Sequence, residues 1–171
     1  MLTLLLGCFA DFTEPDRDRE DVRPGGDVDF EVEVTHFRNG LDLKATGGSP
    51  GTPDVPDNPF EGEEFFSLYN GDEELCRLSW RAEATWDPTD ANGPELQYEN
   101  ACWEPVFRGD VDLCRSVYGQ PPEMVTWPLG VERLDDSTAV FSSHDGMEWV
   151  AVAEGTFDGT DLRYAYDEDV W

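Results

Sequence analysis

The chain has few basic residues and very few histidines. Its 171 residues include 11 Lys and Arg against 39 Asp and Glu, which gives a formal net charge of -28. A surface with this charge repels nucleic-acid phosphates and anionic lipid headgroups, so partners that bind through such groups are excluded. The two histidines are His36 and His144. Ser143, His144 and Asp145 are adjacent in a predicted turn, where side chains diverge, so they do not form a catalytic triad.

Long apolar runs are also missing. No stretch approaches the ~20 apolar residues that a membrane-spanning helix needs. The chain is nevertheless rich enough for a core, with 39% apolar and 12% aromatic residues, and its length suits one domain. Lys44 is its single lysine. A surface rich in Asp and poor in Lys is typical of a saline habitat or of a GC-rich genome, and composition does not separate the two.

The N-terminal residues carry the most specific short motif. Leu5-Leu6-Gly7-Cys8 resembles the lipobox of bacterial lipoproteins, in which the cysteine is lipidated and becomes the first residue. The resemblance covers residues 1–8 only. It implies a signal peptide remnant, an exported protein held to a membrane by the lipid on Cys8, and a place at the outer membrane or cell surface. The alternative is a buried N-terminal strand over residues 2–9.

Residues 9–27 are acidic, rich in Pro and Gly, and lack an apolar period, which predicts a flexible tether. Residues 28–171 are then expected to form a single β-rich domain. Alternation over residues 28–35 predicts a strand. Asn39-Gly40 favours a type I′ turn that would pair Val34 with Ala45 and His36 with Leu43. Residues 47–59, rich in Pro and Gly, are expected to form a surface loop.

Further turn signals divide the rest of the chain into strands. Asn70-Gly71 precedes the clearest alternation, residues 76–86, and residues 96–102 are expected to return beside it. Asp145-Gly146 joins predicted strands at 138–143 and 147–157. Asp158-Gly159 joins the latter to residues 160–167, in a register that would place Ala153 opposite Tyr164, Ala151 opposite Tyr166, and Glu154 opposite Arg163.

One short helix is predicted. Asp110 is a good N-cap for residues 111–118, and Gly119 can end the helix. About 7–9 antiparallel strands with at most this one helix predict an all-β fold, either a sandwich or a small up-and-down barrel of the lipocalin-like kind.

The four cysteines favour a disulfide in an exported compartment. With Cys8 reserved for lipid, three remain. If Trp80 faces Tyr98 across the strand pair, Cys76 lies opposite Cys102 and the two can form a bridge, with Cys114 left as a buried thiol. A Cys102–Cys114 bridge is the second interpretation, and three reduced cysteines is the third. The chain has no C-x-x-C pair, which argues against zinc.

Calcium is the one metal for which residues are available. Asp90, Asn92 and Glu99 match three ligand positions of a calcium loop, but Pro88 and Pro94 do not suit its helix-flanked form. A loose oxygen cage over residues 87–99 remains a hypothesis beside an ordinary acidic loop. No other cofactor is indicated.

Tryptophans offer a second binding hypothesis. Trp80, Trp86 and Trp149 lie in apolar alternation and are expected in the core. Trp103 and Trp127 fall outside it and are candidates for a flat platform that binds a sugar.

Together these patterns predict a lipid-anchored, exported, acidic β-domain that is not an enzyme and that binds an unidentified protein or glycan partner or has a structural role in the envelope. A calcium- or carbohydrate-binding module is one alternative. A small hydrolase with an Asp/Glu pair is another, and it requires carboxylates on an inward face. Glu99 and Glu104 come nearest to that requirement.

Overall fold

The computed structural model describes residues 33–46 and 59–170. The predicted signal peptide remnant, tether and strand 28–35 fall almost wholly outside these residues, as does the loop 47–59 except for Pro59. The described residues form eight strands and one helix: β1 (His36–Ala45), β2 (Phe60–Asn70), β3 (Glu73–Trp86), β4 (Leu96–Gly109), α1 (Val111–Tyr118), β5 (Met124–Arg133), β6 (Thr138–His144), β7 (Trp149–Phe157) and β8 (Asp161–Asp169).

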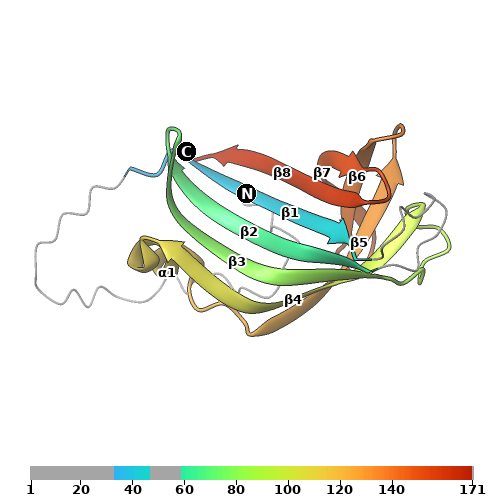
Figure 1. Cartoon of the computed structure of the whole chain (residues 1–171), viewed down its shortest axis with the longest axis horizontal. Helices are drawn as coiled ribbons and strands as arrows, with labels where there is room; N and C mark the ends of the chain where they lie inside the picture. Colours follow the sequence, from blue (N-terminus) through green and yellow to red (C-terminus); the bar gives the residue numbers. More distant parts are fainter. Residues whose placement is uncertain (1–32, 47–58, 171) are drawn as a thin grey trace, which may run out of the picture.

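The strands form a closed, antiparallel, up-and-down barrel (Figure 1). Each strand pairs with the next along the chain, and β1 pairs with β8 from His36 opposite Asp169 to Lys44 opposite Asp161. Closure leaves neither terminal strand with an unpaired edge. The all-β prediction is confirmed, and of its two forms the structure is the barrel. No helix of the described residues is long and apolar enough to cross a membrane.

The core fills the barrel interior. Side chains alternate between inside and outside along each strand, so β3 sends Leu78, Trp80, Ala82 and Ala84 inward, all at most 2% exposed. Phe66 and Phe141 come from other strands, and Phe66 meets Trp80 edge to face with ring centroids 5.8 Å apart. A barrel of this strand number is just wide enough for side chains to fill it or to hold one small ligand.

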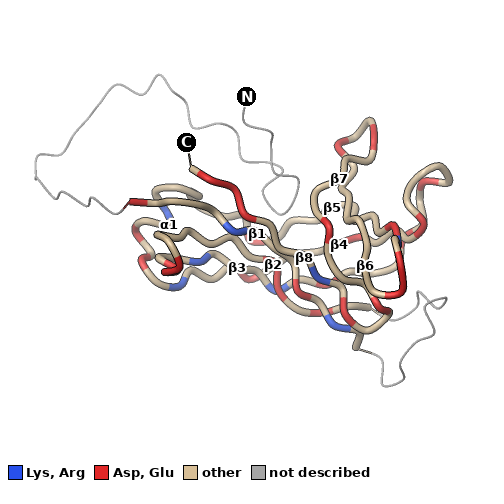
Figure 2. The backbone as a smooth tube through the Cα atoms, turned by 90° about the horizontal axis from the view of Figure 1, so that it is seen from above, with Lys and Arg blue, Asp and Glu red and all other residues tan. Residues whose placement is uncertain are grey.

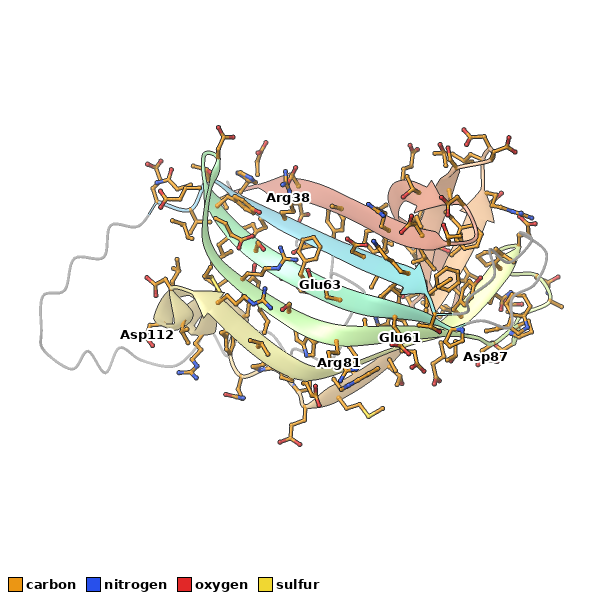
Figure 3. The ribbon with its side chains drawn as sticks, in the orientation of Figure 1. Arg38, Glu61, Glu63, Arg81, Asp87 and Asp112 are labelled. Atoms are coloured by element: carbon orange, nitrogen blue, oxygen red, sulfur yellow. A yellow bond between two sulfur atoms is a disulfide. The ribbon has the colours of Figure 1, made fainter. Side chains whose placement is uncertain are left out.

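The outer face carries the charge. In Figure 3, Arg38, Glu61, Glu63 and Arg81 stand on the outward face of β1, β2 and β3. Arg38 pairs with Asp167 at 2.8 Å, and Arg77 pairs with Glu63. Acidic residues far outnumber basic ones along the described part of the backbone (Figure 2). Exposed pairs of this kind add little stability each, so the barrel depends on its core.

The predicted helix is confirmed, including its ends. The side chain of Asp110 accepts a hydrogen bond from the backbone N of Leu113 at 3.0 Å, and Gly119 ends the helix with its N–H bonded to the carbonyl of Arg115. Cys114, in the middle of α1, is fully buried and forms a disulfide with Cys76 of β3. The bridge fixes α1 at the barrel end where β4 finishes (Figure 1).

The predicted cysteine pairs are therefore wrong. Cys76 does not pair with Cys102 as expected, because Tyr98 lies opposite Trp86 rather than Trp80, and Cys102 lies opposite Ala82. Cys102–Cys114 is excluded as well, since Cys114 is already bridged to Cys76. The prediction assumed a short return strand, whereas β4 continues to Gly109, which is the residue opposite Cys76.

The predicted turn at Asn39-Gly40 is also wrong, because both residues lie in the middle of β1. Gly40 faces outward beneath the ring of Phe65, where an added Cβ would lie 2.6 Å from Cζ. Asn39 points inward and is 3% exposed. A glycine at this position allows the neighbouring strand to pack closely. The Asn-Gly dipeptide therefore occurs inside a strand here, although it is also typical of hairpin turns.

Three other turn predictions are confirmed. Gly71, Gly146 and Gly159 all have positive φ and lie in the β2–β3, β6–β7 and β7–β8 connections. The register after Asp158 is shifted, however: Tyr164 lies opposite Gly155 and Arg163 opposite Thr156. The connection is longer than the expected two-residue turn.

An aspartate side chain holds each of three connections in place. Oδ1 of Asp135 accepts hydrogen bonds from the backbone N of Ser137 and Thr138. Oδ1 of Asp145 accepts from residues 147 and 148, and Oδ1 of Asp158 accepts from residues 160 and 161. These backbone hydrogen bonds lower the pKa of all three carboxyl groups below their usual value of 3.8.

We predict a pH-dependent contribution from these three groups. A carboxyl whose pKa is lower in the folded chain stabilises it above the unfolded pKa, and this contribution is lost as the pH falls through the folded pKa. Asn keeps the acceptor oxygen but does not titrate. The variant for comparison is Asp135→Asn/Asp145→Asn/Asp158→Asn. The native chain should exceed it in free energy of unfolding by a larger margin at pH 7 than at about pH 2.5. Urea unfolding at both pH values measures the difference.

A variant with Asp72→Asn, Asp87→Asn and Asp136→Asn is the matched control. It removes the same charge from exposed aspartates whose side chains accept no backbone hydrogen bond among the described residues. An equal pH dependence for both variants would show that the general loss of negative charge, not the three connections, causes the effect.

We predict that the Cys76–Cys114 bridge contributes about 2–4 kcal/mol to the free energy of unfolding, because it closes a long loop in the unfolded chain. A Cys76→Ala/Cys114→Ala variant should show this loss in urea unfolding without reductant. Val117→Ala, at an exposed position of the same helix, serves as the control. A loss below about 1 kcal/mol would contradict a stabilising role for the bridge.

Candidate functional site

A buried carboxylate lies inside the barrel. Glu64 of β2 is 2% exposed and is the one charged side chain that is buried among residues 33–46 and 59–170. It lies between Leu41 of β1 and Trp80 of β3 in the paired strands. Its neighbours Glu61 and Glu63 point outward (Figure 3), so Glu64 breaks the charge pattern of its own strand.

Donors from β4 and β5 meet this carboxylate across the interior. Oε2 of Glu64 accepts hydrogen bonds from Nδ2 of Asn100 and from Nε1 of Trp127, both at 3.1 Å. Sγ of Cys102 lies 3.0 Å from the same oxygen. Charged groups are buried only when they are hydrogen-bonded in this way, because an unpaired charge costs several kcal/mol in an apolar interior.

The same interior raises the pKa of two tyrosines. Tyr164 is buried on β8, and burial together with the negative charge of Glu64 raises the pKa of its phenol well above 10. Burial also raises the pKa of Tyr166. Both phenols therefore keep their protons at neutral pH. They provide hydrogen-bond donors and no further negative charge around Glu64.

Sequence reasoning missed Glu64, although a signal for it exists. Residues 65–69 are recognisably aromatic, but the alternation on β2 places Phe60, Phe66 and Leu68 in the core, and Glu64 shares their parity. Phe65 has the opposite parity and lies outside, with the guanidinium of Arg77 3.9 Å from its ring centre. Counting parity from Phe60 would have indicated a buried acid.

A second candidate site is a hollow of about 220 Å³ beside β4 and β5. It is open to solvent at the end of β3 that is far from α1. In Figure 3, Asp87 lies at this end and Asp112 of α1 lies at the other. Its lining includes two exposed acidic residues and two threonines, and the remainder is largely aromatic. The lining residues are Asp87, Thr89, Tyr98, Glu99, Thr126, Trp127, Pro128 and Trp149.

The indole of Trp149 is held rigidly at this hollow. Its Nε1 donates to Oδ2 of Asp90 at 2.9 Å, and the ring of His144 meets it edge-on at 5.2 Å. Glycine makes room for the indole at two places. An added Cβ would lie 2.6 Å from Nε1 at Gly93 and 2.9 Å from Cε3 at Gly130.

The connection 87–95 is fixed to β4 by one buried amide. Oε1 of Gln97 accepts from the backbone N of Asp90 at 2.9 Å, and Nε2 of Gln97 donates to the carbonyl oxygens of Asp90 and Pro94. The carboxylate of Asp90 accepts from the backbone N of Asn92 and from Trp149, and these two hydrogen bonds lower its pKa. One wall of the hollow is thus formed in advance.

The candidate calcium ligands Asp90, Asn92 and Glu99 lie in the connection 87–95 and at the adjoining part of β4. Both oxygens of Asp90 are engaged, one by Asn92 and one by Trp149. Glu99 is exposed on β4 and lines the hollow. Within the described ranges, no group of three or more His, Cys, Asp or Glu is arranged to hold a metal ion.

The two tryptophans considered for a sugar platform, Trp103 and Trp127, lie on opposite faces of the sheet. Trp127 is 3% exposed and points inward to Glu64. Trp103 points outward, with Arg81 5.6 Å from its ring centre. Trp149 was expected in the core, yet it packs on the outer face against Gly130. Trp149 is thus a partly exposed aromatic side chain on the outer face.

Comparison with known protein families, with curated proteins and with solved structures finds no match.

We predict that Glu64→Leu lowers the free energy of unfolding by about 2–4 kcal/mol, because it leaves the buried donors of Asn100 and Trp127 without their acceptor. Glu61→Leu, at an exposed position of the same strand, should change it by less than about 0.5 kcal/mol. Urea unfolding of both variants checks the prediction. A similar small effect for both would mean that the hydrogen bonds to Glu64 contribute nothing.

Proposed function

We propose that this chain is an exported, lipid-anchored β-barrel that binds a ligand and does not convert it. The observation that carries the export is the Cys76–Cys114 disulfide. Bridges of this kind persist in oxidising compartments outside the cytoplasm. The lipobox-like Leu5-Leu6-Gly7-Cys8 supports the same compartment and supplies the anchor, with lipid on Cys8. Localisation at the outer membrane or cell surface follows from this proposal.

Binding is favoured over catalysis by the places where the acids lie. A hydrolase with two carboxylates needs one of them protonated near neutral pH, which burial in an apolar setting achieves. Asp87 and Glu99 are both exposed, so neither has the buried, apolar setting that such an acid needs. Glu64 is buried but has no second buried acid beside it in the described part of the chain. The exposed Glu104 pairs with Arg81 on the outer face.

A calcium-binding module is less well supported than a binding barrel without metal. One of the three candidate ligands, Asp90, is already hydrogen-bonded to the indole of Trp149. A cation there would have to share this carboxylate with the two hydrogen bonds that it already accepts. An envelope-structural role without a ligand is the remaining alternative, and the preformed hollow beside Trp149 favours ligand binding over it.

We predict that the protein recovered from a membrane fraction begins at lipid-modified Cys8. Intact mass of the full-length gene product, expressed in a bacterium with lipoprotein processing, measures this directly. Cys8→Ser should release the protein into the soluble fraction, whereas Ser116→Ala, at an exposed position of α1, should leave it in the membrane.

Peptide mapping of the same sample without reductant should recover the peptides of Cys76 and Cys114 as one linked species. Two results would overturn the proposal: an unprocessed chain in the soluble fraction, or Cys8 found in a disulfide instead of carrying lipid.

A further inference from the structure

We propose that the hollow beside Trp149 binds a single sugar ring of a glycan that carries no acidic groups. This inference rests on the proposed binding role and adds a ligand class to it. It does not depend on the lipid anchor. The size of the hollow, the groups that line it and the charge of the surrounding surface all favour such a ligand.

The size of the hollow limits its ligand to one ring. Pockets for drug-sized ligands enclose about 300–1,000 Å³, and this one encloses about 220 Å³. Its open side allows the rest of a chain of sugars to extend into solvent. A polymer with repeated rings fits such a site better than a compact ligand, because only one unit must enter.

The lining groups match the two kinds of surface that a pyranose offers. A sugar ring has an apolar face of C–H groups and a rim of hydroxyls. Trp149 supplies a flat aromatic surface in a fixed position, held by Asp90. Thr89, Thr126, Asp87 and Glu99 supply oxygen atoms around it. A carboxylate can accept hydrogen bonds from two adjacent hydroxyls of the sugar and so fix the orientation of the ring. An aromatic surface alone cannot do this.

Charge excludes acidic sugars. The hollow is lined by two carboxylates and by no basic residue, on a protein of net charge -28. Five arginines of the described residues, at positions 38, 77, 81, 133 and 163, are engaged in ion pairs with acids elsewhere. A uronic or sialic acid would therefore meet only repulsion, whereas a neutral or amino sugar would not.

The larger hollow, of about 350 Å³ at the β5–β6 and β7–β8 connections, is a weaker candidate. Its carboxylates Asp135 and Asp158 already accept backbone hydrogen bonds within their own connections. The carboxylates of Asp87 and Glu99, by contrast, accept no hydrogen bond from the part of the chain that the structure describes. They are therefore available to a ligand.

The test is a titration of the full-length protein, labelled with ¹⁵N, followed through its six indole N–H signals. The probes are glucose, galactose, N-acetylglucosamine and glucosamine, with short oligomers of the sugar that binds, and glucuronic acid as the acidic counterpart. We expect saturable shifts of the Trp149 signal with a dissociation constant on the order of 1 mM for a monosaccharide, tighter binding of its oligomers, no shift at Trp103, and no response to glucuronic acid.

Variants at the two exposed carboxylates assign the site without disturbing the fold. Asp87→Asn and Glu99→Gln should each weaken binding about three- to tenfold, because each replaces a charged acceptor with a weaker neutral one. Glu61→Gln removes the same charge from an exposed position on β2 and should leave binding unchanged. Trp149→Ala should abolish binding, and its circular dichroism spectrum shows whether the barrel still folds.

The outcomes separate this inference from the proposed function. No response to any of these sugars, or binding that is unaffected by both Asp87→Asn and Glu99→Gln, would overturn the sugar site. A shift of Trp149 by calcium alone would also overturn it and would favour a cation site. The compartment and the lipid anchor are measured separately, so each proposal can fail while the other holds.

Discussion

Pairing of β1 with β8 is the constraint on which the rest of the structure depends. It closes the sheet, so every strand has two neighbours and every side chain on a strand faces either the interior or the outside,. Parity then decides the environment of each residue. Glu64, Asn100 and Trp127 fall inside and meet one another there. A carboxylate in that position is tolerated only because β4 and β5 bring its donors to it.

Turn chemistry predicted the connections well but not the register. Asn70-Gly71, Asp145-Gly146 and Asp158-Gly159 are local signals for local events, and the strands change direction at each of them. Asn39-Gly40 has the same sequence as a turn but lies within a strand. Glycine is needed at position 40 because the ring of Phe65 from the neighbouring strand packs closely against it. That reason lies in tertiary packing, which a dipeptide does not reveal. The helix at 111–118 was predictable because its cap and end residues are both local.

The error in the cysteines came from the register between β3 and β4. The prediction placed Tyr98 opposite Trp80, whereas Tyr98 lies opposite Trp86 and Cys76 lies opposite Gly109. Local alternation shows which residues share a face, but it does not fix which residues of two strands lie opposite each other. The register also contains an irregularity between Ser79 and Arg81, and Glu104 on the facing strand has a positive φ, which few residues other than glycine adopt,.

In a chain with 39 acidic residues, a carboxylate by itself does not indicate function. The contacts that each carboxylate already makes are more informative. Asp110 caps α1, Asp135, Asp145 and Asp158 fix connections, and Asp90 positions an indole. These groups explain local structure and have little left for a ligand. Asp87 and Glu99 have no such role and share a hollow with that indole. An aromatic surface fixed by one acid and flanked by two others is a more specific arrangement than acidity itself, and for this reason the search for a ligand begins there.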